Sequence, residues 1–122
     1  MNKTATPFVK PTITYGALVG QVLHNYRKQT GADQALIAQA LGITQSAYSR
    51  IEKGHSAMSL TQLRTVAGQF GIMPSSILSE VDGYAEQLGF QGVEVSNEKE
   101  VSPGAILVAL GILAAIFAAA GK

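Results

Sequence analysis

The sequence contains no cysteine. This absence excludes disulfide bonds, thiol catalysis and cysteine-ligated metal, and it fits a reducing compartment. No apolar stretch lies near the N-terminus, so we expect no secretory signal peptide. The two histidines, His24 and His55, have no other metal ligands at usable spacing, and no Ser-His-Asp arrangement is indicated. We therefore expect no metal site, no cofactor and no enzymatic activity.

Charge is scarce and unevenly placed. The net charge is only +1, yet residues 1–80 carry seven lysines and arginines against three acids. Residues 81–122 carry two lysines against five acids, so the first part is basic and the second acidic. The basic part, residues 1–80, is called the head below, and its charge suits a polyanionic partner such as nucleic acid.

Apolar residues recur at helical spacing in five segments of this chain of 122 residues, which is the size of one small domain with extensions. The predicted helices are Tyr15 to Thr30, Asp33 to Leu41, Gln45 to Lys53, Leu60 to Phe70 and Pro74 to Leu88. Helix-capping residues precede three of them, at Thr14, Asp33 and Thr44, and glycines follow most of them. In the second helix we expect a buried side made of Leu36, Ile37, Ala40 and Leu41.

The segments that flank this helical part differ from it in composition. Residues 1–14 contain two prolines and are expected to form a flexible arm. Residues 90–104 contain the polar run Asn97 to Glu100 and then Ser-Pro-Gly, and they predict a linker in which Val93 to Val95 are compatible with a short strand. The helical domain is therefore expected to span residues 15–89.

The stretch from Asp33 to Gly54 predicts two short helices joined by a tight turn. A helix that enters the major groove of DNA needs short polar side chains at its N-terminal end. Gln45 can pair with adenine, Arg50 can pair with guanine or a phosphate, and Ser46 and Ser49 can contact bases or backbone. The N–H groups at the start of the preceding helix, beside Gln34, are suitable phosphate ligands.

From about Leu18 to Leu78 the chain resembles the lambda-repressor-like, Cro-type helix-turn-helix family, also called the xenobiotic-response-element type. The residues that carry the resemblance occur in the family's order and spacing. They are Arg27, Gly31, Gln34, Ala38, Leu41, Gly42, Thr44 to Ser46, Ser49 to Glu52, Gly54, Leu63, Ala67 and Phe70 to Ile72. The resemblance implies an all-α fold with five helices in the helix-turn-helix domain. The apolar residues at the C-terminal end predict a hydrophobic helix in addition.

The resemblance also implies roles for single residues. It implies that Gln45, Ser46, Ser49 and Arg50 contact bases. It implies phosphate contacts from a second set, which comprises Gln34, Thr44, Lys53, His55 and Ser56. It further implies a structural ion pair between Arg27 and Glu52, which would keep an acidic side chain on this helix from opposing DNA. Asp33 departs from the family pattern and places a negative charge near a phosphate.

The C-terminal tail, residues 105–121, has no charged or polar side chain. As a helix its apolar part would span roughly 25–28 Å, slightly less than the ~30 Å hydrocarbon core of a bilayer. Three alternatives stay open: a transmembrane anchor, a helix buried in a protein assembly, and a tail that inserts only in some states. Gly111, Ala115 and Ala119 lie four residues apart, a spacing that favours close helix contact.

These patterns together predict a sequence-specific transcriptional regulator that binds double-stranded DNA as a homodimer or higher homo-oligomer. The head is expected in the cytoplasm, held at the inner face of a membrane if the tail spans it. The alternative is an interaction module, in which the same domain binds protein, the tail builds an oligomer or a membrane complex, and DNA has no role.

Overall fold

Five helices form the N-terminal domain in the computed structural model, which describes residues 9–97 and 101–121. They are α1 (Tyr15–Thr30), α2 (Gln34–Leu41), α3 (Gln45–Glu52), α4 (Leu60–Gln69) and α5 (Pro74–Phe90). The side chains of Thr14, Asp33 and Thr44 each accept a hydrogen bond from a backbone N–H three residues later, so each caps a helix as the sequence predicts. The all-α, five-helix prediction is therefore confirmed for this part of the chain.

Two helix ends differ in detail from the sequence prediction. Ser59 and Gln62 form a reciprocal capping box at the start of α4, which the sequence prediction did not include. Helix α5 continues through Gly89 to Phe90, because the positive φ that ends it belongs to Gly92 (φ 81°). A glycine at helical φ is tolerated inside a helix, so its presence alone did not mark the end.

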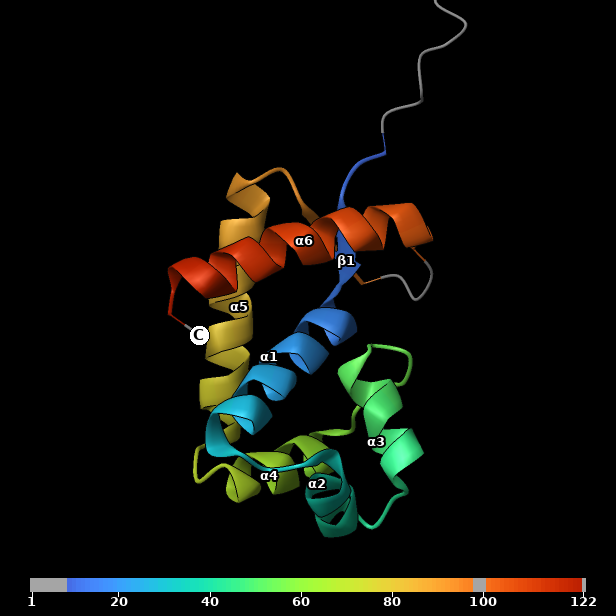
Figure 1. Cartoon of the computed structure of the whole chain (residues 1–122), viewed down its shortest axis with the longest axis vertical. Coiled ribbons are helices and arrows are strands. Elements are labelled where there is room, and N and C mark those ends of the chain that lie inside the picture. The colour runs from blue at the N-terminus through green and yellow to red at the C-terminus, as the bar shows by residue number, and fades with distance from the viewer. Residues whose placement is uncertain (1–8, 98–100, 122) are drawn as a thin grey trace, which may run out of the picture.

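Helix α1 lies in the middle of the domain, between α3 and α5 (Figure 1). Its residues Leu18, Val22 and Leu23 are fully buried. In α2 the buried side differs from the one predicted: Ile37 and Ala38 are buried, while Leu36 is 56% exposed. The short helix turns Ala38, and not Ala40, toward the core, so the apolar residues from Ala35 to Leu41, which are interrupted only by Gln39, do not identify which side packs.

The backbones of α1 and α3 approach each other closely at Gly20 of α1. A Cβ atom placed on Gly20 would lie 2.2 Å from the backbone oxygen of Glu52, at the end of α3. This distance is far below van der Waals contact, so only glycine allows α1 and α3 to cross here. The crossing matters for function because α3 carries the predicted DNA-contacting residues.

A two-stranded parallel sheet joins segments that are distant in the sequence. Strand β1 (Thr12–Thr14) pairs with β2 (Glu94–Ser96), with Ile13 opposite Val95. Ile13 is fully buried, so the end of the segment expected to be a flexible arm is in fact part of the core. The predicted linker likewise contributes a strand, one residue later than Val93 to Val95. Residues 1–8 of the predicted arm lie outside the described part of the chain.

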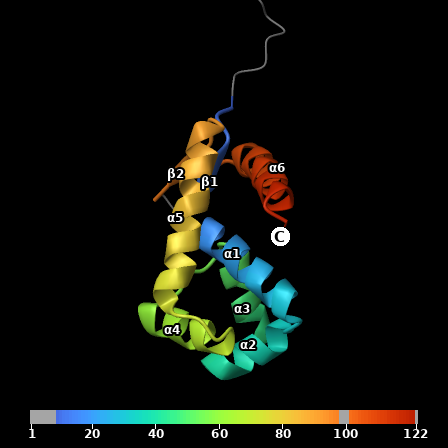
Figure 2. The ribbon, with the colours of Figure 1, turned by 90° about the vertical axis from the view of Figure 1, so that its left-hand side faces the viewer.

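Helix α6 (Pro103–Ala119) crosses β1 and α5 at one end of the molecule (Figures 1 and 2). It buries one side, made of Ala105, Ala109, Leu113 and Phe117, against the domain. The Phe117 ring meets the Tyr84 ring edge to face at a centroid distance of 4.8 Å. The hydrophobic tail therefore packs on its own chain.

Within the described residues, none of the helices has both the length and the apolar character needed to cross a bilayer. The transmembrane anchor, one of the three alternatives for residues 105–121, is therefore not supported. Helix α6 is 17 residues long, which is about 25 Å at 1.5 Å per residue, and it uses one side for packing on the domain.

Tyr15 ties the start of α1 to α5. Its hydroxyl donates to Asp82 Oδ1 at 2.8 Å, and burial together with this negatively charged acceptor raises the pKa of Tyr15 to about 12. A raised folded-state pKa contributes stability that is complete below the unfolded value of about 10 and is lost as pH rises toward the folded value.

We expect Asp82→Asn to lower the pKa of Tyr15, because the amide keeps a hydrogen-bond acceptor but removes the charge. The measurement is an ultraviolet titration of tyrosinate, with Tyr15→Phe identifying which transition belongs to this side chain. An unchanged transition in Asp82→Asn would mean that the carboxylate does not influence Tyr15.

Candidate nucleic-acid interface

Helix α3 is placed by the short turn that follows α2. Gly42 adopts the left-handed conformation (φ 70°), and the N–H of Ile43 bonds back to the Ala38 oxygen at 3.0 Å. This arrangement ends α2 sharply and lets Thr44 start the next helix two residues later. The Thr44 hydroxyl accepts from the Ala47 N–H at 3.1 Å, so its oxygen already has a capping role.

The two sides of α3 have opposite character. Tyr48, Ile51 and Glu52 are buried. The four residues predicted to contact bases lie on the other side: Gln45, Ser46 and Arg50 are exposed, and Ser49 is partly exposed. The structure thus presents all four to the outside along a helix of eight residues.

A shallow groove of about 520 Å³ runs beside this outer side. Its lining consists of the four predicted base-contacting residues together with two predicted phosphate ligands, Gln34 and Lys53. The groove therefore brings together residues from α2, α3 and the turn after α3. It contains two cationic side chains, those of Arg50 and Lys53, and no carboxylate.

The loop after Gly54 is tied to the outer side of α3. Arg50 Nε donates to Ser56 Oγ at 3.3 Å, so Ser56 orients the guanidinium. Gly54 has a φ of 78°, and a Cβ at this position would lie 2.5 Å from the Cα of Ala17 in α1. His55 is exposed in the same loop but does not line the groove.

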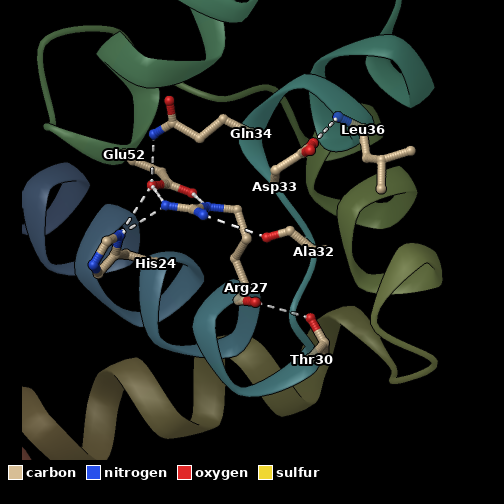
Figure 3. A network of polar contacts seen from close by, with 8 residues as sticks. All are labelled: His24, Arg27, Thr30, Ala32, Asp33, Gln34, Leu36 and Glu52. Carbon is tan, nitrogen blue, oxygen red and sulfur yellow. Dashed lines mark hydrogen bonds and ion pairs between the residues drawn. The ribbon is translucent and has the colours of Figure 1, made fainter.

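A buried carboxylate lies directly behind α3 (Figure 3). Glu52 is 4% exposed and receives a bidentate pair from Arg27, whose Nε is 2.8 Å from Oε2 and whose Nη2 is 3.1 Å from Oε1. Arg27 Nη1 also donates to the Ala32 carbonyl at 3.3 Å. This fork ties α1 to the last turn of α3 and to the segment before α2.

Two further side chains complete the network around Glu52 (Figure 3). His24 Nδ1 lies 3.2 Å from Glu52 Oε1 and 3.1 Å from Arg27 Nη2. Gln34 Nε2 donates to Glu52 Oε1 at 3.0 Å. Burial alone would raise the pKa of Glu52, but the hydrogen bonds from Arg27 and Gln34 outweigh it and hold this pKa below its usual range.

Gln34 therefore has a contact that sequence reasoning missed. It was predicted to contact phosphate, and it does line the groove, but one of its amide hydrogens is directed to the buried carboxylate. The predicted pair of Arg27 and Glu52 already indicated such a contact. A carboxylate accepts up to about four hydrogen bonds, so a buried Glu52 needs donors in addition to Arg27.

Tyr48 reaches the same region from the inner side of α3. Its side chain is fully buried, and its hydroxyl has no hydrogen-bond partner among the described residues. Burial, with the nearby charge of Glu52, raises the pKa of Tyr48 well above its usual value. The group consequently stays neutral, and it adds no charge to the network.

No cluster of three or more metal-ligating side chains occurs within residues 9–97 and 101–121. Another depression on the described surface lies at the start of α5 and is lined by three serines and Glu80. It has an acidic side chain and no cation, so it offers no site for a polyanion. The α3 groove is the surface whose chemistry suits nucleic acid.

Comparison with known proteins agrees with this geometry. Residues 23–76 match the model of the helix-turn-helix family, which confirms the resemblance seen in the sequence. A comparison with curated protein sequences gives no match.

Two solved structures of the clp gene regulator ClgR from Corynebacterium glutamicum have a similar fold. One has a TM-score of 0.53 at 23% identity, covering 57% of this chain and 90% of that chain. The other has a TM-score of 0.60 at 22% identity, covering 63% of this chain and 82% of that chain.

Proposed function

Because residues 23–76 match the model of the helix-turn-helix family, we propose that this protein is a transcriptional regulator that binds duplex DNA through α3. The observation that carries the proposal is the outer side of α3, where Gln45, Ser46 and Arg50 are exposed beside a carboxylate-free groove. A helix about 10–12 Å wide fits the major groove, which is about 12 Å wide.

Each side chain of the groove has a distinct part in this proposal. Gln45 stands at the first position of α3, where a side chain reaches base edges, and its amide matches the donor and acceptor of adenine. Arg50, oriented by Ser56, contacts guanine or a phosphate. The phosphates of the DNA backbone are contacted by Lys53 and by the second amide hydrogen of Gln34. Around the ends of α3, they are also contacted by Thr44, His55 and Ser56.

The buried network holds α3 in place from its inner side. Arg27, Glu52 and Gln34 join α1, α2 and α3, so the two helices of the motif keep a fixed angle when they meet DNA. The network also neutralises the one carboxylate of α3. Without Arg27 this acid would face a polyanion across a short helix.

The first test is salt-dependent binding by the full chain. Contacts to phosphates release counterions, so the affinity for any duplex must fall as salt concentration rises. A preferred sequence is selected from random duplexes, and binding is measured by fluorescence anisotropy at several salt concentrations. If the full chain binds no duplex in a salt-sensitive way, the DNA proposal fails and the protein-interaction alternative gains support.

Gln45→Ala then tests the role of the groove. Loss of one bidentate base contact costs about 1–3 kcal/mol, so the affinity for the selected sequence is expected to drop by roughly 5- to 150-fold. Binding to unrelated duplexes should stay unchanged, because Gln45 is not proposed to contact phosphates. The matched control is Gln87→Ala, an exposed glutamine on α5. Equal binding by Gln45→Ala and the control would remove Gln45 from the proposed base-contacting set.

A further inference from the structure

The outward side of α6 carries no polar group. Its exposed residues are Gly104, Leu107, Val108, Gly111, Ala114, Ala115, Ala118 and Ala119. At 100° per residue they all fall on one side of the helix, opposite the buried residues that pack on α5 and β1. Leu107 is 72% exposed and Val108 is 48% exposed. We name these eight residues the α6 outer face.

Large and small side chains are separated along the α6 outer face. Leu107 and Val108 lie in its first half, Gly111 lies at its middle, and the second half contains only alanines. If two copies meet antiparallel with their Gly111 residues at the centre, Leu107 of each copy faces Ala115 of the other. Val108 then faces Ala114 in the same way. In a parallel pair, leucine would instead face leucine and alanine would face alanine. The large side chains would hold the first halves apart, and a gap would remain between the alanines of the second halves.

We propose that a second copy of this chain covers the α6 outer face, in an antiparallel pair centred on Gly111. The complementarity of the two halves identifies the partner, because a two-fold pair must fit the surface to itself. The absence of charge along the whole face requires an equally apolar partner. A further reason rests on the proposed function: the α3 groove has only two cations, Arg50 and Lys53, so firm DNA binding calls for two copies.

Helix α6 lies far from the start of α2. Figures 1 and 2 place α6 at one end of the long axis and α2 and α4 at the opposite end. A partner on the α6 outer face would therefore not cover the start of α2, where Gln34 borders the groove.

The size of the α6 outer face sets the strength of the pair. A helix of 17 residues offers a strip of roughly 25 Å by 10 Å, so the pair buries on the order of 500 Å² in total, less than the roughly 1,000 Å² of a stable interface and in the range of weak, transient ones. The pair is accordingly weak and concentration-dependent in solution. Two adjacent DNA sites would raise the local concentration and favour it.

Sedimentation velocity of the full chain, without DNA, is the first measurement. The mass is expected to rise from 12.8 kDa toward twice that value as the protein concentration increases. Gly111→Glu should stay monomeric at every concentration. Gly83→Glu on α5 is the matched control, because a Cβ at either glycine meets nothing within 4 Å and neither change disturbs the fold. Circular dichroism verifies that both variants keep the wild-type helix content.

Cross-linking tests the antiparallel register, because the chain has no native cysteine. Gly111→Cys places the two thiols at the centre of the pair, so oxidation should yield a disulfide-linked dimer. Ala118→Cys places them roughly 20 Å apart at 1.5 Å per residue, so it should yield little. Efficient cross-linking of Ala118→Cys would overturn the antiparallel pair.

Other occupants of the α6 outer face give different results. A wild-type chain that is monomeric at all concentrations overturns the proposal. So does a monomer that floats with phosphatidylcholine–phosphatidylglycerol vesicles and loses this binding in Gly111→Glu, which would identify lipid as the partner. Since neither assay contains DNA, a failure of the proposed DNA binding would leave these results interpretable.

Discussion

Replacing Arg27 with methionine is expected to lower the free energy of unfolding by about 3–5 kcal/mol at neutral pH, the usual cost of leaving a buried charge without its partner. Glu52 is 4% exposed, and Arg27 supplies two of the hydrogen bonds to its carboxylate. Methionine fills similar space but donates nothing, so the carboxylate keeps the burial cost and loses its main compensation. Urea denaturation followed by circular dichroism measures the change.

The pH dependence of this loss gives a stricter test. In the wild type the folded-state pKa of Glu52 is below its usual value, so the stability from this group is present above about pH 4.3 and is lost as pH falls through the folded pKa. In Arg27→Met, burial dominates and raises the folded-state pKa above the unfolded one. The variant's deficit is therefore small below about pH 4.3 and grows as pH rises through the new folded pKa.

Two further variants separate the ion pair from the general effect of removing an arginine. Arg64→Met, on the exposed side of α4, should change stability by no more than about 0.5 kcal/mol. The double variant Arg27→Met/Glu52→Met should be more stable than Arg27→Met alone, because no unpaired charge remains. A double variant as unstable as the sum of its two single changes would show that the charges do not act as a pair.

Gly20→Ala is expected to be the most damaging single methyl addition in α1. The new Cβ would lie 2.2 Å from the Glu52 oxygen and 2.7 Å from the Ile51 oxygen, and both are backbone atoms that cannot rotate away. Helix α3 must shift, so we expect a loss of at least about 3 kcal/mol, the upper end of ordinary overpacking. If the variant folds, its DNA binding should weaken as well, because α3 carries Gln45 and Arg50.

Gly83→Ala is the matched comparison, since it makes the same chemical change at an open helical position. It is expected to stabilise the protein by about 0.5–1 kcal/mol, because alanine is the better helix former. The two glycines should thus respond with opposite signs in thermal denaturation. A Gly20→Ala variant that is as stable as Gly83→Ala would show that α1 and α3 do not cross as closely as described.

Much of the helical part could be predicted because its information is local. A capping side chain, an apolar stripe and a terminal glycine all lie within one helix, and Thr14, Asp33 and Thr44 mark three starts correctly. The buried side of α2 was less certain, because nearly every residue of that helix is apolar and its length allows only two turns. Leu36 was consequently placed in the core and is exposed.

The parts that depend on distant contacts were not predicted. Thr12 to Thr14 is too short to identify as a strand without its partner, and β2 lies 82 residues further along. At the candidate site, the spacing placed Gln45 and Arg50 on the outer side of α3, while the bond from Gln34 to Glu52 depends on how α2 packs against α3. The tail seemed able to span a bilayer because its sequence does not reveal which side packs on α5.

The pairing of β1 with β2 also sets an order of events during synthesis. Helix α6 packs on β1 and α5, and β1 is held in place by a strand from the other end of the domain. Contacts between such distant segments form slowly, and α6 leaves the ribosome after α1 to α5 because it follows them in the chain. The five helices α1 to α5 are therefore made before α6, so under the proposed pairing a chain that still lacks α6 has no α6 outer face with which to associate.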